Sequence, residues 1–300
     1  MNWKARLLYP QNWNIGFVEQ KMTDLLDKQQ LGRIRWMKHS YKDRWFADPF
    51  IYKVTDKEII VFVEECLISD TPKGILCELH VDRKTMRLRE RFVLLELDTH
   101  LSYPAIIEKD GIAYVYPENG ASGSLKIYRY DEENHQLVAP VCILNDAVAD
   151  STILSVDDTY YIIATKSKES KEKAYLYQSK DLLGEYKLVK ELPVQTNRSC
   201  SRPAGNWITV SDQLYRPAQD CSESYGGAIN IMRVVSLAPF HEEKSFCIKP
   251  EWFKYSFGTH TINFYKDASL TVIDGYGYLH PLIARIWTKL SSTKDRILNK

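Results

Sequence analysis

The sequence predicts an all-β fold: a five-bladed β-propeller closed by strands from the N-terminus, with a short C-terminal helix. The first observation is an internal repeat, because five similar segments begin 55, 47, 52 and 58 residues apart, at Asp48, Tyr103, Asp150, Arg202 and His260. The second is that apolar and polar residues alternate after each opening, which is typical of strands. The third is an aromatic content of 12%, with 19 Tyr and 7 Trp, because aromatic residues favour strands.

Each repeat contains strand-like runs in the same order. A polar residue and then a proline or small residue open the first run, and a turn with Asp or Gly leads to the second. The second runs read EIIVFVEE, IAYVYPE, YYIIATK, QLYRPAQD and LTVIDG. Four repeats continue with a third and a fourth run, such as ILCELHVD and FVLLEL in the first repeat. Four antiparallel strands repeated at this spacing predict propeller blades.

The fifth repeat has only two strand-like runs, because helical spacing begins after Gly277. Two unassigned runs near the N-terminus, 13–20 and 32–38, fit its missing third and fourth strands, with a short helix around 21–30 between them. We therefore expect the N-terminal strands to close the ring and to cover the open edges of blade five. The predicted propeller domain spans residues 1–278.

The tail, residues 279–300, is predicted to form a basic amphipathic helix. Basic residues dominate its polar positions, and its apolar residues recur at helical spacing: Leu282, Ile283, Ile286, Trp287 and Leu290. Two interpretations are open. The helix binds a membrane surface or a partner, or it packs against the side of the propeller.

The charge balance excludes a general nucleic-acid binder. The 40 Lys and Arg residues and 39 Asp and Glu residues leave a net charge of +1, without the basic excess that such a protein needs. We see no apolar region typical of a signal peptide or a membrane span. The six cysteines are scattered without paired motifs, which favours reduced thiols. We expect a cytoplasmic protein, at the inner membrane face where the basic tail binds lipid.

The repeat spacing also predicts where chemistry would occur. In an antiparallel hairpin the start of the first strand and the end of the second meet at one edge. The first strand of a propeller blade lines the central channel, so the repeat openings and the residues 14 to 18 positions later should meet at one mouth. This construction gathers carboxylates, basic side chains, a histidine, a threonine and an aromatic ring: Asp48, Glu64, Glu65, Tyr103, Glu118, Asp150, Thr165, Lys166, Arg202, Arg216, Asp220, His260 and Asp274.

The openings of repeats one and three are WFADPF at 45–50 and DST at 150–152. They resemble the blade openings of the five-bladed propeller glycosidases of families 32, 43 and 68. In family 43 an Asp of blade one is the general base, and an Asp of blade three tunes the pKa of the general acid. The resemblance implies these two roles for Asp48 and Asp150.

Blade four departs from that pattern. The general acid of family 43 is a Glu at the opening of blade four, and the corresponding residue here is Arg202. An arginine cannot donate a proton at neutral pH. Either Glu118 or Glu65 supplies the second carboxyl group that hydrolysis needs, or the activity is not hydrolysis.

A combination of short strings across nearly the whole chain is similar to a second group of propellers. The strings are HLSYP at 100–104, YPE at 116–118, RPAG at 202–205, YRPAQD at 215–220, YG at 225–226 and GTHT at 258–261. They resemble the propeller domain at the N-terminus of plant glucosamine inositolphosphorylceramide transferases and in bacterial proteins of surface-polysaccharide loci. The resemblance implies glycan synthesis, although transfer in the plant proteins is ascribed to a separate C-terminal domain.

Three functions remain open from the sequence. The first is glycosyl transfer in surface-glycan assembly, with a carboxylate such as Asp48 as general base. Arginines at the mouth would then bind a nucleotide- or lipid-linked phosphate donor. The second is intracellular glycoside hydrolysis by Asp48 with Glu118 or Glu65. The third is glycan binding without catalysis.

The expected partner in each case is a carbohydrate. The candidate catalytic residues are Asp48, Glu118, Asp150 and Glu65. The candidate substrate-binding residues are His100, Tyr103, Arg202, Arg216, Asp220, Tyr225, His260 and Asp274. The sequence has no phosphate-binding loop motif, and lone histidines such as His100 and His260 more often form hydrogen bonds than bind metals. We therefore expect neither a cofactor nor a metal site.

Overall fold

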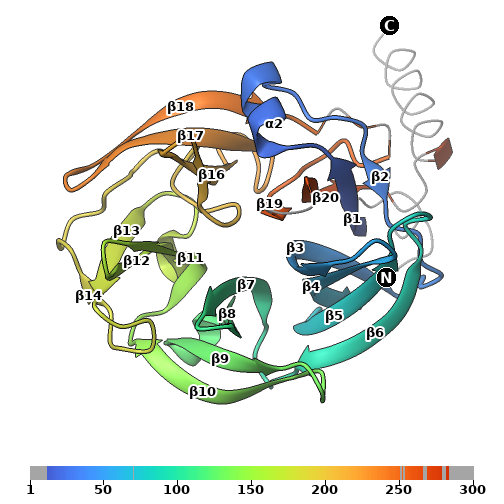
Figure 1. Cartoon of the computed structure of the whole chain (residues 1–300), viewed down its shortest axis with the longest axis horizontal. Coiled ribbons are helices and arrows are strands. Elements are labelled where there is room, and N and C mark those ends of the chain that lie inside the picture. The colour runs from blue at the N-terminus through green and yellow to red at the C-terminus, as the bar shows by residue number, and fades with distance from the viewer. Residues whose placement is uncertain are drawn as a thin grey trace, which may run out of the picture.

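The computed structural model describes residues 12–69, 71–250, 252, 254–265, 269–278 and 282–283. Its strands form five four-stranded sheets in which hydrogen-bonded neighbours are antiparallel. Figure 1 shows the five sheets arranged as the blades of a ring. This arrangement confirms the five-bladed β-propeller predicted from the repeats.

The first four blades follow one another along the chain. Blade one contains β3 (Arg44–Val54), β4 (Glu58–Leu67), β5 (Gly74–Asp82) and β6 (Leu88–Leu95). Blade two contains β7 (Ser102–Lys109), β8 (Ile112–Glu118), β9 (Leu125–Asp131) and β10 (Gln136–Leu144). Blade three contains β11 (Val148–Val156), β12 (Thr159–Lys166), β13 (Ala174–Ser179) and β14 (Lys187–Leu188). Blade four contains β15 (Ile208–Val210), β16 (Gln213–Asp220), β17 (Ala228–Leu237) and β18 (Phe240–Ile248). The fourth strands β6, β10, β14 and β18 lie at the rim of the ring (Figure 1).

Blade five is assembled from both ends of the described chain. Its strands, in the order of the sheet, are β19 (Ile262–Tyr265), β20 (Leu270–Gly277), β1 (Asn12–Glu19) and β2 (Arg35–Trp36). β1 pairs with β20 along its full length, from Asn12 opposite Gly277 to Glu19 opposite Leu270. The prediction that two N-terminal runs complete blade five is therefore confirmed, although only two residues of the second run form a strand.

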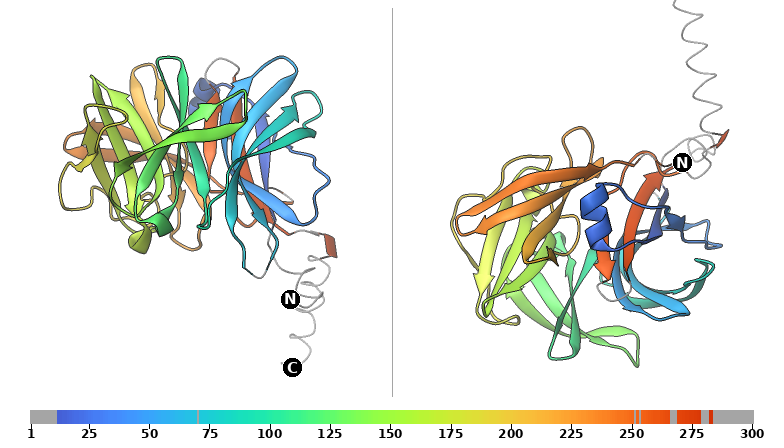
Figure 2. Two further views of the ribbon diagram at one scale, coloured as in Figure 1. Left: turned by 90° about the horizontal axis from the view of Figure 1, so that it is seen from below. Right: turned by 45° about the horizontal axis from the view of Figure 1, so that its top comes forward.

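The helix expected around 21–30 is α2 (Met22–Lys28), which links β1 to β2. Its buried residue Leu25 belongs to one apolar cluster with Ile231 of blade four and Ile273 of blade five. The helix therefore covers the junction between these two blades (Figure 2).

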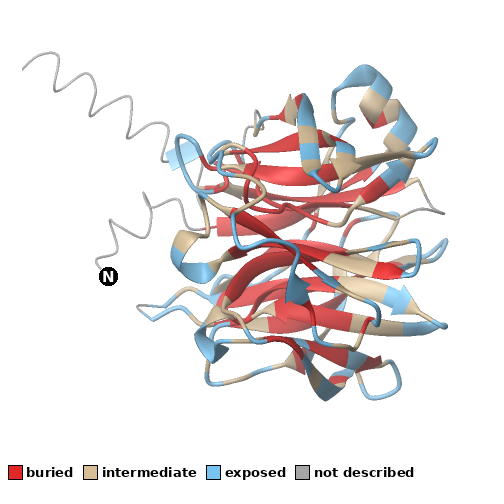
Figure 3. Ribbon diagram, turned by 90° about the vertical axis from the view of Figure 1, so that its left-hand side faces the viewer, coloured by how far each residue is buried: buried red, intermediate tan, exposed pale blue. Residues whose placement is uncertain are grey.

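The core lies largely between neighbouring blades. Phe50 of blade one, Tyr103 and Tyr116 of blade two, and Ile162 of blade three share one buried cluster. Figure 3 shows buried residues along the middle of the strands and exposed residues mainly in the connecting loops. Because close-packed interiors are rigid, clusters shared between blades hold the inner strands in place and give the mouth a fixed frame.

The first strands of blades one, two and three begin with the same irregularity. Each has a bulge in its pairing with the second strand of its blade. The bulge residues Asp48, Tyr103 and Asp150 have φ angles of 50°, 48° and 46°. A bulge changes the direction of the side chain at its position. We therefore expect the same change of direction at the equivalent positions of blades one, two and three.

Two features outside the ring were also predicted. The C-terminal helix expected at 279–300 lies outside the described residues, except for the exposed Leu282 and Ile283. Within the described residues, no helix is long and apolar enough to cross a bilayer. All six cysteines have free thiols in the structure, and four of them are buried.

Candidate active site at the propeller mouth

The bulge at the start of β3 places the Asp48 carboxylate in a buried hydrogen-bond network. Asp48 Oδ1 accepts a bond from Thr261 Oγ1 (2.5 Å), and Oδ2 accepts one from the backbone N–H of Tyr103 (3.1 Å). The backbone N–H of Asp48 donates to Asp274 Oδ2 (3.3 Å). Residues of blades two and five thus fix the position of a carboxylate from blade one.

His260 and Asp274 form the blade-five part of this cluster. His260 Nδ1 lies 2.5 Å from Asp274 Oδ2 and 3.5 Å from Asp48 Oδ1. Burial disfavours the charged imidazole, but the carboxylates of Asp274 and Asp48 outweigh burial and raise the pKa of His260 to about 9. A protonated His260 therefore lies between two carboxylates at neutral pH.

Asp150 and Arg202 form a buried ion pair between blades three and four. Arg202 Nε and Gln219 Nε2 both donate to Asp150 Oδ2, each at 2.5 Å. Glu118 Oε2 accepts bonds from Arg202 Nη2 (3.2 Å) and from the backbone N–H of Asp150 (3.1 Å). Arg202 Nη1 donates to the Ser170 carbonyl (3.3 Å). All three guanidinium nitrogens therefore have an acceptor.

The group around Asp48 and the ion pair of Asp150 with Arg202 influence each other electrostatically. Burial raises the pKa of Asp48 to about 6, while His260 opposes this shift and the Asp150 carboxylate adds to it. Burial raises the pKa of Asp150 to about 7, while Arg202 opposes the shift and Glu118 adds to it. Both carboxyl groups therefore titrate near neutral pH, where acid and base catalysts are most effective.

Tyr225 covers this cluster from the loop between β16 and β17. Its ring centroid lies 5.3 Å from the guanidinium carbon of Arg202 and 5.5 Å from the His260 ring. Lys171 Nζ lies 5.5 Å from the same centroid. Tyr225 is 42% exposed, so the ring offers an accessible aromatic surface above the buried charges.

Glu64 and His100 form a further pair that interacts with the cluster. His100 Nε2 lies 3.3 Å from the buried Glu64 Oε1, and His100 Nδ1 accepts a bond from the backbone N–H of Gly74 (2.9 Å). The hydrogen bond to Glu64 raises the pKa of His100, and the charges of Glu118 and Asp48 add to this shift. Half of the His100 side chain is exposed, so this pair borders the solvent.

The residues Asp48, Asp150, Arg202, His260 and Asp274, with the side chains that contact them, are called the mouth cluster below. The predicted residue Glu65 does not join it. Successive side chains of a strand point to opposite faces, and Glu65 follows Glu64 on β4. Its carboxylate forms ion pairs with Arg44 Nη1 (2.7 Å) and with Arg91. Glu65 is therefore neutralised inside blade one.

Three predicted binding residues have other contacts. Arg216 is fully buried and forms an ion pair with Glu242 within blade four. Asp220 accepts a hydrogen bond from Asn230 Nδ2 (3.2 Å) at the base of the loop that carries Tyr225. Tyr103 is fully buried, and it contributes its backbone N–H to the network around Asp48.

Sequence reasoning missed three members of the cluster. The ring of Trp13 stacks on His260 with centroids 4.0 Å apart, Gln219 binds Asp150, and Thr261 binds Asp48. Gln219 precedes the predicted Asp220 by one position, so strand alternation could have identified it. Trp13 could have been found from the predicted pairing of its run with the second strand of blade five.

Asp48, His260 and Asp274 also offer three ligand atoms within 4.8 Å of one another. These atoms already have partners, because Thr261 Oγ1 donates to Asp48, and Asp274 Oδ1 accepts the backbone N–H groups of His260 (2.8 Å) and Thr261 (3.1 Å). A protonated His260 offsets one of the two negative charges, and these hydrogen-bond donors stabilise the carboxylate oxygens.

Comparison with known families shows the family to which the chain belongs. Residues 34–250 match the family described as "Glucosamine inositolphosphorylceramide transferase 1, N-terminal". The chain belongs to this family. Glucosamine inositolphosphorylceramide transferase 1 of Arabidopsis thaliana is 26% identical over 223 residues, which cover 69% of this chain and 29% of that protein. The Oryza sativa subsp. japonica protein of the same name is 24% identical over 205 residues, or 66% of this chain and 27% of that protein. The chain thus matches less than a third of the length of these relatives.

Solved structures show that this member of the family shares its fold with glycosidases. The catalytic domain of Coprinopsis cinerea GH62 α-L-arabinofuranosidase matches 79% of this chain and 92% of its own, with a TM-score of 0.56 and 10% identity. The GH43_1 enzyme from Xanthomonas citri complexed with xylotriose matches 77% of this chain and 86% of its own, with a TM-score of 0.51 and 13% identity. Both resemblances expected from the sequence, to the transferase propeller and to the glycosidase fold, are confirmed.

Proposed function

We propose that the mouth cluster is a carbohydrate-active site of glycan biosynthesis. In this proposal Asp48 takes a proton from an acceptor hydroxyl while a glycosyl group is transferred from a phosphate-containing donor. The observation that carries it is the buried Asp48 carboxylate, fixed by hydrogen bonds from blades two and five, close to the exposed Tyr225 ring that contacts His260. Membership of a transferase family supports the setting in glycan biosynthesis.

Asp48 has the properties of a general base. A base works best when its pKa is near the operating pH, because it is then ionised and still accepts a proton readily. Each carboxylate oxygen has two lone pairs, and Asp48 Oδ2 accepts one protein hydrogen bond, from the Tyr103 N–H. A second lone pair on Oδ2 therefore remains for an acceptor hydroxyl.

Arg202 supports a phosphate-containing donor over a neutral one. A departing sugar oxygen needs a proton, which arginine does not supply, whereas phosphate departs as an anion that cations stabilise. Arg202 binds Asp150 at 2.5 Å and Glu118 at 3.2 Å, so an incoming phosphate would displace the more weakly held Glu118. Lys171 lies beside the same Tyr225 ring and would supply a second cation.

The relatives are named for transfer involving an inositolphosphorylceramide. For this chain we propose only the shared chemistry, a nucleotide- or lipid-linked phosphate. Binding of the chain to a lipid surface through residues 279–300 belongs to the same proposal, since a lipid-linked substrate would be presented there.

A second candidate, glycoside hydrolysis, is favoured by Glu118. Hydrolysis needs two carboxyl groups that flank the bond, and Glu118 is a carboxylate of the cluster whose side chain is 19% exposed. Glu118 would protonate the leaving sugar and Asp48 would activate water. Glu65, the other acid considered from the sequence, is held by Arg44 and Arg91.

The variant Asp48→Asn tests the proposed base. Asparagine keeps the size of the side chain and tolerates the left-handed backbone of this position, but it cannot accept the proton. We expect turnover to fall by at least about 100-fold, with a melting temperature within a few degrees of the wild type. Asp158 is exposed, with a φ of 55° in the turn between β11 and β12, so Asp158→Asn is a matched control that should retain activity.

The assay uses nucleotide sugars with lipid-linked acceptors, followed by mass spectrometry of the product, and neutral oligosaccharides, followed by reducing-end release. Transfer that is lost in Asp48→Asn and kept in Asp158→Asn supports the proposal. Reducing-end release without transfer selects hydrolysis instead. Binding without turnover selects a glycan-binding propeller, and full activity in Asp48→Asn removes Asp48 from the mechanism.

A further inference from the structure

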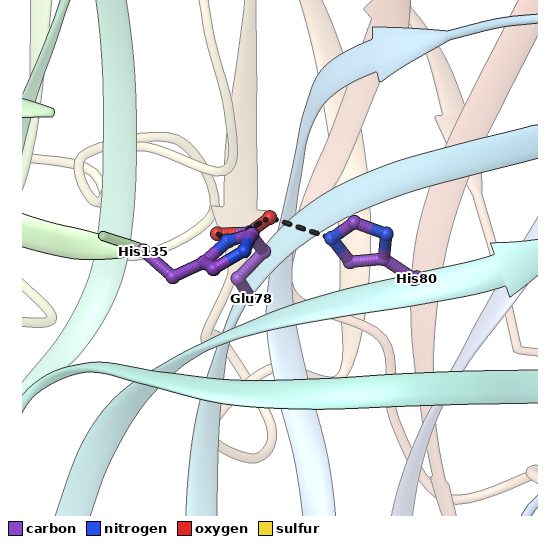
Figure 4. A group of neighbouring side chains, drawn as sticks. All are labelled: Glu78, His80 and His135. Carbon is purple, nitrogen blue, oxygen red and sulfur yellow. Dashed lines mark hydrogen bonds and ion pairs between the residues drawn. The ribbon is translucent and has the colours of Figure 1, made fainter. Parts of the chain in front are cut away.

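A second cluster of titratable side chains lies where blade one meets blade two, outside the mouth cluster (Figure 4). Glu78 and His80 belong to β5, and His135 directly precedes β10. Glu78 Oε1 lies 2.7 Å from His80 Nε2 and 3.1 Å from His135 Nδ1. Each residue contributes one potential ligand atom, and these atoms lie within 4.8 Å of one another.

We propose that Glu78, His80 and His135 bind a divalent transition-metal ion, with Zn²⁺ as the expected occupant, and that the ion ties blade one to blade two. Two imidazole nitrogens and one carboxylate oxygen form a ligand set that suits zinc, with a water completing the coordination. Zinc bonds of about 2.0–2.2 Å in a tetrahedron separate the ligand atoms by roughly 3.3 Å. The distance between His80 Nε2 and Glu78 Oε1 would widen by about 0.6 Å to reach that separation.

The surroundings of His80 support metal binding at its Nε2. His80 Nδ1 lies 3.2 Å from Glu58 Oε1, so both ring nitrogens face carboxylate oxygens. A neutral imidazole has one N–H and one lone pair, and a proton held on Nδ1 by Glu58 leaves the lone pair of Nε2 pointing at Glu78. A carboxylate on the outer nitrogen is the arrangement that orients metal-bound histidines, and a metal ion at Nε2 would replace its hydrogen bond to Glu78 Oε1.

The charges around His80 also support metal binding. Three carboxylates, Glu58, Glu78 and Glu90, lie within 4 Å of His80 nitrogens. Within the described ranges, none of the three has a lysine or arginine at ion-pair distance. Glu78 is buried, and a buried carboxylate is costly unless it is paired. Protonated histidines can offset part of this negative charge, and a divalent cation would offset it while leaving both imidazoles neutral.

Neighbouring side chains already orient the three ligands. Tyr130 Oη donates a hydrogen bond to Glu78 Oε2 (2.7 Å), which leaves Oε1 facing His80 and His135. The Phe92 ring stacks on His135 with centroids 3.8 Å apart and an interplanar angle of 5°. Ligands that are held in place by such contacts bind a metal more tightly than mobile ones.

The test measures zinc binding to tag-free protein. We expect mass-spectrometric metal analysis after dialysis to find one zinc per chain, and zinc to raise the melting temperature. His135→Asn removes one ligand and should weaken zinc binding at least about tenfold. Asparagine suits the left-handed backbone of His135 (φ 51°), and the partial exposure of this residue limits the effect on folding. The exposed His241 on β18 gives the control His241→Asn, which should bind zinc like the wild type.

The proposal is overturned when wild-type protein shows no zinc binding and no zinc-dependent stabilisation. It is also overturned when His135→Asn keeps one tightly bound zinc, because the ion then lies elsewhere, for example at Asp48, His260 and Asp274. Should His135→Asn fail to fold, His80→Gln removes another of the three ligands and takes its place, with loss of zinc binding expected and retention of a tightly bound zinc overturning the proposal. None of these results depends on the catalytic activity of the mouth.

Discussion

At the scale of single residues, Asp48 and Asp150 combine an unusual backbone with a buried charge. Both have left-handed φ angles, which aspartate adopts more readily than most residues. The aspartates at the repeat openings could therefore be recognised in the sequence. The partner Thr261 could not, because it comes from blade five and contacts Asp48 of blade one only when the ring is closed.

The titrations of the cluster predict how stability depends on pH. The pKa of His260 rises from 6.5 to about 9 on folding, so the folded chain binds this proton more tightly than the unfolded chain. Its stabilisation is present in full below about pH 6.5 and is lost as the pH rises through 9, and it amounts to about 3 kcal/mol. The raised pKa values of Asp48 and Asp150 act in the same direction at lower pH, because ionising these buried carboxyls costs stability.

Urea unfolding at pH values from 6.5 to 9 checks this prediction. We expect the free energy of unfolding to fall over this range in the wild type and to fall less in His260→Gln. His80 and His100, whose pKa values are also raised, remain in both proteins, so their contributions to the two slopes are the same. Equal slopes in the two proteins would show that His260 is not charged in the folded state.

At the scale of elements, a glycine before the first strand of blade four lies at the contact with blade five. Gly205 has a φ of 143°, and a Cβ there would lie 1.9 Å from the backbone oxygen of Ile262 in blade five. The preceding residue Ala204 accepts a hydrogen bond from the Ile262 N–H (2.7 Å). Blades four and five thus meet backbone to backbone, and only glycine fits between them.

We expect Gly205→Ala to destabilise the fold by about 2–4 kcal/mol, because it adds a steric overlap to backbone strain. Gly123 has a φ of 76°, and a Cβ there would have no atom within 4 Å, so Gly123→Ala introduces strain alone and should cost about 1 kcal/mol. Denaturant unfolding of both variants measures the difference. Similar losses would mean that the contact between blades four and five is looser than the structure shows.

The strands themselves were largely predictable, because alternation and turn residues are local signals. The exceptions are the outer strands β14 and β2, which have two residues each although longer apolar runs were found in the sequence. An outermost strand has a partner on one side only. Its length therefore depends on packing against neighbouring elements, which a single run of sequence does not reveal.

At the scale of the whole molecule, ring closure decides which residues meet. The repeat spacing correctly predicted that Asp48, Asp150, Arg202 and His260 lie close together, because each repeat forms one blade. It also selected Glu65, which points away from the mouth, since position along a strand does not identify the face.

The sequence analysis did not identify two contacts that join distant parts of the chain. Glu78 and His135 lie 57 residues apart and meet only across the junction of blades one and two. Trp13 reaches His260 because β1 is inserted beside β20. The candidate site therefore depends on both ends of the propeller, although no local signal links them.

The central claim, that a sugar-containing ligand binds at the mouth, is tested most directly by thermal unfolding against nucleotide sugars and neutral oligosaccharides. A ligand at 100 times its Kd should add about 2.7 kcal/mol of stability. Tyr225→Ala removes the exposed ring at the mouth, and Tyr265→Ala alters a separate cavity of about 620 Å³ beside α2. The account predicts stabilisation that Tyr225→Ala abolishes and Tyr265→Ala preserves. The reverse pattern, or no stabilisation by any member of the two panels, would contradict it.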